Sequence, residues 1–379
     1  MMRHLHAGTS TIRRAHALFA LGLAVAVAAC ATSGLPSGTS RAPAPGIGSI
    51  SSDSQWPMST REHVDLWLHG YAVLTTDTAR VPFFQRGYRQ RMRDLKNQRN
   101  VYTQLDANAE QLSARFLANP SLVNGQFVPL YFSSFEQIQQ VVAAFLQSGG
   151  RVGAARDPTM QAYFGLLNGT FPSAADRDWL RLFVQCLGDE DRRFYHDYWN
   201  QQQTARTATR TAVDSLWARV YRPRLQRFLN NTQQENGELI LSLPLDGEGR
   251  SVNFSRQQNA VAVAYPDSVA GAVEAIYVLA HEVVNAITTT AIKDNTTPAE
   301  QRSGASGAYT ANATVRGGAL LLQKAAPELL QGYMRYYLRS AGLSVPTGDA
   351  SAVFASTFTL PDAIRDAISR QLDVVLGGI

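Results

Sequence analysis

The sequence predicts a mainly α-helical fold with a small antiparallel β-sheet, an α+β arrangement. Apolar side chains recur at helical spacing over most of residues 59–233, which indicates a body of many helices. Between residues 238 and 265, three short runs rich in apolar and β-branched residues are separated by turn sequences, as is typical of a small sheet. The next run, 269–292, is apolar on nearly every side and predicts a buried helix.

The composition is that of an ordinary soluble protein with a substantial core. The chain has 379 residues, of which 45% are apolar and 17% charged. We predict four regions: a signal peptide (1–29), a lipidated cysteine with a flexible tether (30–56), a helical domain (57–235), and a domain of sheet and helices (236–379) packed against it.

The first 29 residues have the pattern of a secretory signal. Arg3, Arg13 and Arg14 precede the apolar run Ala17–Ala29 without any acidic residue. A positive start, a short apolar stretch and small residues before a cleavage point are the parts of a signal peptide. The apolar run is too short for a stable membrane span.

The end of this segment, Val-Ala-Ala followed by Cys30, resembles a bacterial lipobox. The resemblance implies that Cys30 becomes the mature N-terminus and carries acyl chains that anchor the protein to a membrane. By the habit of that family, Ala31 in place of an aspartate implies the outer membrane, with the protein facing the periplasm. The alternative is an ordinary cleaved signal followed by an unrelated cysteine.

The segment that follows is predicted to be a tether without a fold of its own. Residues 31–56 are rich in Ser, Gly, Pro and Ala and have little to bury. Removing the signal takes away three of the 35 basic residues and no acidic one, so the net charge falls from +5 to +2. No nucleic-acid partner is predicted from such a charge. Cys186 is the one thiol left and is expected to be a buried, inert side chain.

The helical domain offers three histidines as candidate site residues. We predict a helix capped by the box Ser59-Thr60-Arg61-Glu62, with Asp65 and His69 paired on its solvated side. The same pair is also a candidate metal pair, and His63 is a spare imidazole at the edge of the apolar stripe. His196, among aromatic residues, is expected to be a hydrogen-bonded residue of the core or its rim.

Further elements follow from caps and breakers. Residues 125–132 are predicted to be extended, and a long helical region, capped by Ser173 to Asp176, runs to about Gln233 with a break near Gly188. The predicted strands are Glu238–Leu245, Ser251–Phe254 and Asn259–Tyr265. Further helices are predicted at 298–324, 327–341 and 361–376.

The helix at 269–292 carries His281 and Glu282 side by side. Leaving an unpaired imidazole or carboxylate in apolar surroundings costs several kcal/mol, roughly, so each side chain is expected to have a partner or a use. The sequence His-Glu-Val-Val-Asn matches the first half of H-E-x-x-H, a helical motif whose two histidines bind zinc and whose glutamate activates the metal-bound water.

With the strands before it, this stretch resembles the zincin-like metallopeptidases, in particular the thermolysin-like gluzincins. The resemblance implies zinc as a cofactor, His281 as a ligand, Glu282 as general base, and a further glutamate ligand on the next helix. The sequence departs from the pattern at two places. Asn285 stands where the second histidine is expected, and Arg316 stands where the glutamate is expected.

Two interpretations of the pair remain open. Glu274, His281 and Asn285 fall within about 60° of one another on a helical wheel. In the first interpretation His281 binds zinc, weakly assisted by Asn285 and by residues such as Glu274 or Glu300, and Glu282 acts as general base. In the second, the metal is lost and Arg316 pairs with Glu282 or Glu274. The second is favoured, because the guanidinium of Arg316 places a positive charge where the zinc ion would bind.

A third class of function needs no zinc: a lipid-anchored binding or scaffolding protein of the cell envelope that presents a groove to a peptide or protein partner. A serine hydrolase is not predicted, because the chain has no Gly-x-Ser-x-Gly. Phosphate loops and dinucleotide fingerprints are also absent from the sequence.

Overall fold

The computed structural model describes residues 56–76 and 79–377. The predicted signal peptide, Cys30 and the tether up to residue 55 lie outside the described residues. Within them the fold is mainly helical with one small sheet, which confirms the predicted fold class.

The sheet is mixed rather than antiparallel. Its four strands are β1 (Met58–Thr60), β2 (Glu238–Ser242), β3 (Arg250–Ser255) and β4 (Gln258–Ala264), in the order β1-β2-β4-β3. β3 and β4 form an antiparallel hairpin, but β2 pairs with β4 and with β1 in parallel. The prediction missed this because β3 takes the outer position and because β1 comes from the N-terminal region. The sheet thus draws strands from both 57–235 and 236–379.

The start of the fold differs from the prediction in two ways. Trp56 belongs to the core and not to the tether: it is 2% exposed, its Nε1 donates to Gln234 O (3.0 Å), and its own carbonyl accepts from Trp217 Nε1 (2.8 Å). The capping box predicted at Ser59 does not form, because that residue lies in β1. Arg61 is the N-cap, and its side chain makes no capping bond.

The N-terminal region is built from short helices and two π-helical turns. Its elements are α1 (Glu62–Leu74), α2 (Tyr88–Gln98), α3 (Gln104–Ala107), α4 (Ala109–Ala118), the 3-10 helix η1 (Pro120–Tyr131), α5 (Phe135–Gln147), η2 (Val152–Ala154), α6 (Pro158–Thr170), α7 (Ala174–Glu190), the π turn η3 (Asp191–Tyr195), α8 (His196–Ala205), α9 (Thr207–Leu216), the π turn η4 (Trp217–Tyr221) and α10 (Arg222–Asn231).

Three local predictions can be compared with these elements. The cap at Ser173 is confirmed, since its side chain accepts from Asp176 N and the Asp176 side chain accepts from Ser173 N. The extended piece predicted at 125–132 is wrong for all but its last residue: residues 125–131 lie within η1, whose first turn is capped by Asn119, and only Phe132 is extended. The break at Gly188 is also wrong, because the helix continues to Glu190 and then widens into η3.

The C-terminal region packs helices on the sheet and on one another. Its elements are η5 (Val269–Gly271), α11 (Glu274–Val283), α12 (Asn285–Asp294), α13 (Pro298–Ser303), α14 (Ala305–Ala325), η6 (Pro327–Leu329), α15 (Leu330–Ser340), α16 (Ser351–Thr357) and α17 (Asp362–Leu376). The single helix predicted at 269–292 is therefore interrupted at Val284, and the one at 298–324 is interrupted at Gly304, whose φ is +78°.

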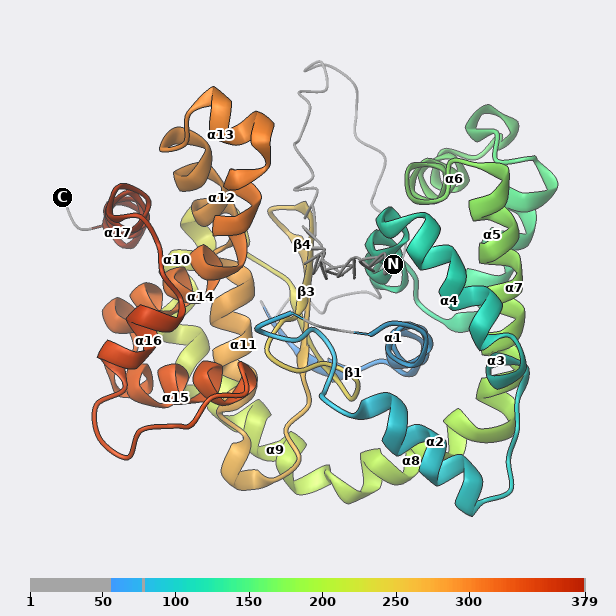
Figure 1. The fold of residues 1–379 in the computed structure, drawn as a ribbon, viewed down its shortest axis with the longest axis horizontal. Helices are drawn as coiled ribbons and strands as arrows, with labels where there is room; N and C mark the ends of the chain where they lie inside the picture. The colour runs from blue at the N-terminus through green and yellow to red at the C-terminus, as the bar shows by residue number, and fades with distance from the viewer. Residues whose placement is uncertain (1–55, 77–78, 378–379) are drawn as a thin grey trace, which may run out of the picture.

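The sheet lies between two groups of helices, with α10–α17 on one side and α1–α7 on the other, while α8 and α9 run across one end (Figure 1). Helix α11 packs directly on β4 and is covered by α14 and α15. The stretch Val269–Asp294 is long and apolar enough to cross a membrane by composition alone. In this fold it is a core segment, 78% buried by protein over its most apolar window.

Close packing of α14 depends on a glycine. A Cβ added at Gly318 would lie 2.2 Å from Tyr333 Oη, which donates a hydrogen bond to Val315 O (2.9 Å). We expect Gly318→Ala to lower the free energy of unfolding by about 1–3 kcal/mol, because the tyrosine must move out of a filled core. Urea unfolding followed by circular dichroism measures this change.

Gly307 lies in the same helix, and a Cβ there meets no atom within 4 Å. Gly307→Ala is therefore the matched control, with an expected gain of up to about 1 kcal/mol from helix propensity. Equal effects of the two substitutions would contradict the packing argument.

Candidate functional site

His281 and Glu282 lie in the last turn of α11, between the sheet and α15. They are 4% and 5% exposed, so both side chains are withdrawn from water. The prediction of a buried helix carrying an ionisable pair is confirmed. The question for function is what satisfies the polar atoms of the pair.

One carboxylate oxygen of Glu282 is bonded to donors close to it. Its Oε1 accepts from Gly249 N (3.0 Å) and from His281 Nδ1 (3.0 Å). Burial by itself would raise the pKa of Glu282, but these bonds and the positive charge of Arg250 lower it below its usual value. The glutamate is therefore an ionised hydrogen-bond acceptor, which is a structural state and not that of a free base facing a substrate.

The backbone donor depends on a glycine in the turn before β3. A Cβ at Gly249 would lie 2.4 Å from the carbonyl oxygen of Ala262 and 2.7 Å from Cγ of Glu282. Only glycine lets the chain pass between the strand and the helix at this point. The sequence showed this residue as part of a turn, but not its contact with Glu282.

Arg250 closes the space beside the pair. Its Nη2 donates to Gln126 Oε1 (2.6 Å), and its guanidinium lies 3.5 Å from the ring centroid of Phe83. Gln126 belongs to η1, which packs against β3. The helical region thus covers the sheet where a substrate would have to approach Glu282.

His281 has one ring nitrogen engaged and one unengaged. The ring stacks on Tyr337 with centroids 5.4 Å apart and an interplanar angle of 19°, and Tyr337 Oη donates to Gly247 O (2.9 Å). Nδ1 faces Glu282, whereas Nε2 is buried and has no hydrogen-bond partner among the residues that the structure describes. A buried nitrogen without a hydrogen-bond partner costs about 1–3 kcal/mol.

The other ligands suggested by the sequence lie elsewhere. Asn285 follows the interruption at Val284, and its Oδ1 faces Thr314 Oγ1 (3.4 Å) on α14. Glu274 pairs with Arg339 (2.5 Å) on α15. The interruption at Val284 removes the i, i+4 geometry between His281 and Asn285 on which the wheel relied, and Glu274 is engaged by Arg339, so the structure does not bring these residues together as a ligand set.

Glu300, the remaining acidic candidate, is exposed and closes the capping box of α13. It accepts from Thr297 N (2.8 Å), and this bond lowers its pKa. The pair predicted for Arg316 does not form either, since Glu282 and Glu274 are engaged by the partners named above. The guanidinium of Arg316 instead lies 5.6 Å from the ring centroid of Phe354, in α16.

The donor set at His281 does not fit zinc. Structural zinc sites use four ligands and catalytic sites three, drawn mainly from His, Cys, Asp and Glu. In the described part of the chain, His281 and Glu282 have no third residue of these types beside them, and the candidate ion site that does occur lies elsewhere. One orphaned nitrogen and one engaged carboxylate are too few to hold the ion.

The histidines and the aspartate of α1 are buried, contrary to the solvated pair that we predicted. Asp65 and His69 are 0% exposed and face partners on other elements. Asp65 accepts from Trp199 Nε1 (2.9 Å) and Leu243 N (3.2 Å), and burial raises its pKa to about 7. His63 Nε2 donates to Phe132 O (2.9 Å), and burial lowers its pKa to about 4. Neither His63 nor His69 therefore lies beside His281 as a second metal ligand.

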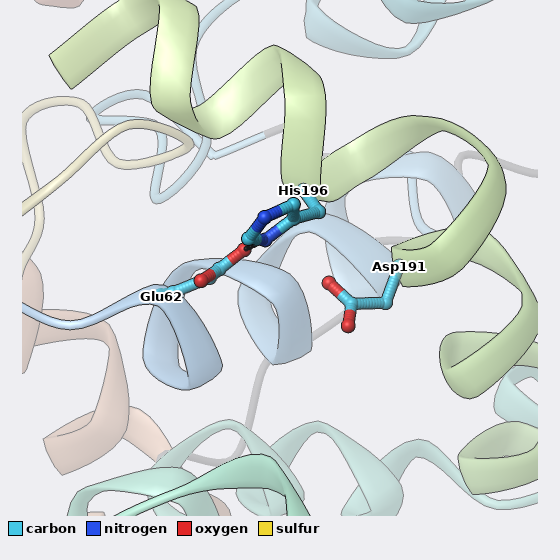
Figure 2. A group of neighbouring side chains, drawn as sticks. All are labelled: Glu62, Asp191 and His196. Carbon is cyan, nitrogen blue, oxygen red and sulfur yellow. Dashed lines mark hydrogen bonds and ion pairs between the residues drawn. The ribbon is translucent and has the colours of Figure 1, made fainter. Parts of the chain in front are cut away.

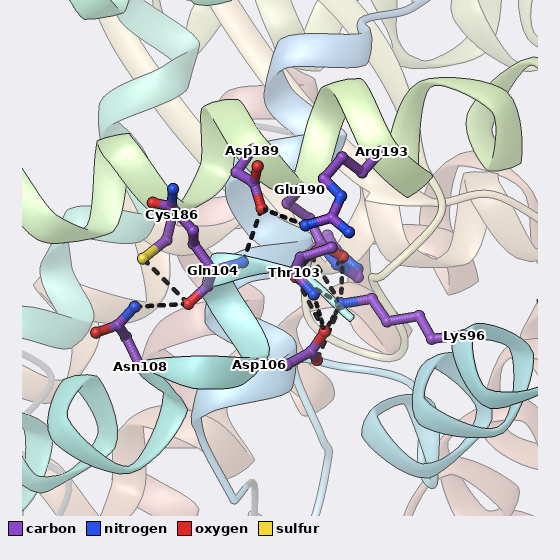
Figure 3. Close-up of polar contacts among 10 residues, drawn as sticks. Lys96, Thr103, Gln104, Asp106, Asn108, Cys186, Asp189, Glu190 and Arg193 are labelled. Carbon is purple, nitrogen blue, oxygen red and sulfur yellow. Dashed lines mark hydrogen bonds and ion pairs between the residues drawn. The ribbon is translucent and has the colours of Figure 1, made fainter. Parts of the chain in front are cut away.

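His69 belongs to a buried ionic network that the sequence analysis missed. Glu190, at the end of α7, is bonded to His69 Nε2 (2.9 Å). It also binds Lys96 Nζ (2.7 Å), and Lys96 in turn binds Asp106 (3.0 Å) (Figure 3). Burial would raise the pKa of Glu190, but His69 and Lys96 lower it to about 2. The sequence did contain a sign of this network. Glu190 lies on the same helical stripe as the apolar Phe183 and Leu187, so it places a charged residue at a core position.

The same end of α7 holds Cys186, whose predicted burial is confirmed. The side chain is buried, its Sγ donates to Gln104 O (3.5 Å), and burial raises its pKa to about 11 (Figure 3). A surface hollow of about 250 Å³ lies beside the network, with Lys96 and Asp106 in its wall and Arg89 and Arg93 also lining it. The ion pairs already neutralise Lys96, so the hollow offers no free buried charge.

Compared with known protein families, with curated proteins and with solved structures, the chain gives no match in any of the three. A function is therefore inferred from the residues and contacts of this chain alone.

The buried Asp65 gives a pH dependence of known sign. Its ordinary pKa is 3.8 and its folded value about 7, so between pH 4 and 7 the native protein holds a proton that the unfolded chain has lost. The free energy of unfolding should therefore decrease with rising pH across this window and level off above it. We expect Asp65→Asn to remove this slope, by about 2–4 kcal/mol across the window.

The measurement is urea unfolding of wild type and variant at several pH values. The difference between their free energies of unfolding removes the contributions of the other titrating groups. Asp94→Asn, at an exposed position of α2, is the control and should follow the wild-type profile. Parallel profiles for wild type and Asp65→Asn would show that Asp65 titrates normally.

Proposed function

We propose that the protein is a lipid-anchored cell-envelope protein whose sheet and His-Glu helix derive from a metallopeptidase but no longer catalyse. In this proposal Cys30 carries the lipid, and the folded body acts as a binding or scaffolding element for a peptide or protein partner at the membrane. The observation that carries the loss of catalysis is the sealed state of Glu282.

The burial of Glu282 and the bonds to its carboxylate matter because a general base must be able to reach its substrate. A candidate base lies within about 3 Å of the proton it takes, directly or through one water. Oε1 of Glu282 instead accepts hydrogen bonds from Gly249 N and His281 Nδ1. Beside it, η1 covers β3 through the contact between Gln126 and Arg250. This closure supports a structural role for the pair.

The donor geometry supports the same conclusion. Asn285 and Glu274 are engaged with α14 and α15, and Glu300 is a helix cap. An active enzyme would need both a rearranged helix at Val284 and a new ligand from elsewhere. The alternative of an active zinc peptidase completed by outside ligands is therefore the weaker candidate.

The role of the pair can be tested through stability. Glu282→Ala leaves Gly249 N and the His281 ring without their acceptor, and we expect a loss of about 3–5 kcal/mol in unfolding free energy. Glu282→Gln keeps a neutral oxygen acceptor and should cost about 1–2 kcal/mol. Glu300→Ala, which removes an exposed cap, is the control, with about 1 kcal/mol or less.

A peptidase gives the opposite pattern. Glu282→Gln would then abolish hydrolysis of a general protein substrate such as casein while leaving stability almost unchanged, and His281→Ala would release a bound zinc ion. Either result would overturn the proposed structural role.

The membrane anchor is tested by Cys30→Ser. Loss of the thiol prevents acylation, so we expect the variant protein to move from the membrane fraction to the soluble fraction. Fractionation and mass spectrometry of the N-terminal peptide measure the change. Cys186→Ser is the matched control and should stay with the membrane, because that thiol is buried in the fold. A Cys30→Ser protein that remains membrane-bound contradicts the anchor.

A further inference from the structure

A second group of potential ligands lies on the other side of the molecule, where α1 begins. Glu62 is the first residue of α1, Asp191 opens the π turn η3, and His196 opens α8. One ligand atom from each lies within 4.8 Å of the other two. Figure 2 shows the carboxylate of Glu62 against the imidazole and the carboxylate of Asp191 turned toward both.

The π turn brings two of these residues together. In an α-helix, positions five apart are separated by about 140° around the axis and face different directions. Here the backbone N–H of His196 donates to the carbonyl of Asp191, the wider bonding pattern of a π turn, so both side chains lie on one face. Single π turns inside helices occur frequently at functional sites.

Asp191 has an oxygen that lacks a partner. Its Oδ1 is buried and has no hydrogen bond among the residues that the structure describes. The two arginines that follow it in η3, Arg192 and Arg193, pair with Asp189 instead, at 4.0 and 3.8 Å. Leaving a buried carboxylate oxygen unsatisfied is costly, and a cation between Asp191 and Glu62 would remove that cost together with the repulsion between them.

His196 can join such a cation. Its Nδ1 lies 2.7 Å from Glu62 Oε1, and its Nε2 lies 3.0 Å from the side-chain amide of Asn200. With the ion on Nδ1, the ring proton moves to Nε2 and is accepted by the amide oxygen of Asn200 after a flip of that amide. Ligating histidines commonly hold their other ring nitrogen by such a bond.

We propose that Glu62, Asp191 and His196 bind a divalent transition-metal ion such as Zn²⁺ or Mn²⁺. One imidazole with two carboxylates suits these ions better than Ca²⁺, which prefers six or more oxygen ligands. The side chains of His196 and Glu62 are 56% and 30% exposed, so an ion can enter from solvent. The bound ion links the start of α1 to the junction of α7 and α8 and keeps coordination positions open to water. This site is independent of the metallopeptidase-like pair.

The test is isothermal titration of the mature protein with ZnCl₂, together with thermal unfolding in the presence of the same salt. We expect one ion per chain and a rise in the unfolding midpoint with zinc concentration. His196→Gln and Asp191→Asn should each weaken binding by about tenfold or more, since even residues behind a ligand contribute that much. CaCl₂ should bind more weakly than ZnCl₂.

Two control variants make the result specific. Asp197→Asn removes an exposed carboxylate beside His196 that is not part of the group, and it should bind zinc like the wild type. His281→Ala should also leave zinc binding unchanged. Absence of zinc binding overturns the proposal, as does binding that His196→Gln and Asp191→Asn do not weaken. His196 is exposed, so its variant is expected to fold.

Discussion

Carboxylates held away from water determine how the two halves of this chain fit together. Asp65 on α1 reaches the backbone after β2, Glu190 joins α7 to α1 and α2, and Glu282 joins α11 to the turn before β3. Each needs fixed donors, because an unpaired buried charge costs more than ordinary packing returns. Apart from His281, the neighbour of Glu282, these donors come from other elements of the fold, so the contacts require sheet and helices to be in their final positions.

The hydrogen bonds to these carboxylates also bear on the proposed function of the His281-Glu282 pair. Glu282 is held by a backbone amide and by its own neighbour, His281, in a space closed by η1 and Tyr337. Both donors hold the Glu282 carboxylate in place within the fold, which supports the structural role proposed for the pair. Among the described residues, Nε2 of His281 is buried without a hydrogen-bond partner, so the second ring nitrogen of the pair adds no polar contact to the fold.

The group at Glu62 has the opposite character. Its residues lie at helix ends, are partly open to solvent, and include a carboxylate oxygen without a donor. It depends on the π turn η3, one of two such turns in the long helical stretch between α7 and α10. A π turn replaces the regular i, i+4 backbone hydrogen bonds of the helix with i, i+5 bonds. Here it places Asp191 and His196 on the same face. The buried pair thus differs from this group in exposure and in having both of its residues held inside the fold.

Local patterns were sufficient for much of the secondary structure and for one aspect of the site. Period-two runs gave the strands at 238–264, helical spacing gave α11, α14, α15 and α17, and the Ser173 box gave the start of α7. The apolar surroundings of His281 and Glu282 predicted their burial. These features depend on neighbours within a few residues, whose side chains lie on known faces of a helix or strand.

The tertiary structure decided everything that depended on distant partners. From sequence, Asp65 and His69 read as a solvated i, i+4 pair, yet α2, α7 and β2 bury them. Arg316 read as the partner of Glu282, but the interruption at Val284 and the turn at Gly249 give that role to the backbone. The parallel pairing of β1 and β2 and the π turn at Asp191 carry no comparable local pattern. The physical reason is similar in these cases: a short pattern specifies which face a side chain occupies, whereas the donor or acceptor it meets depends on how separate segments of the chain pack together.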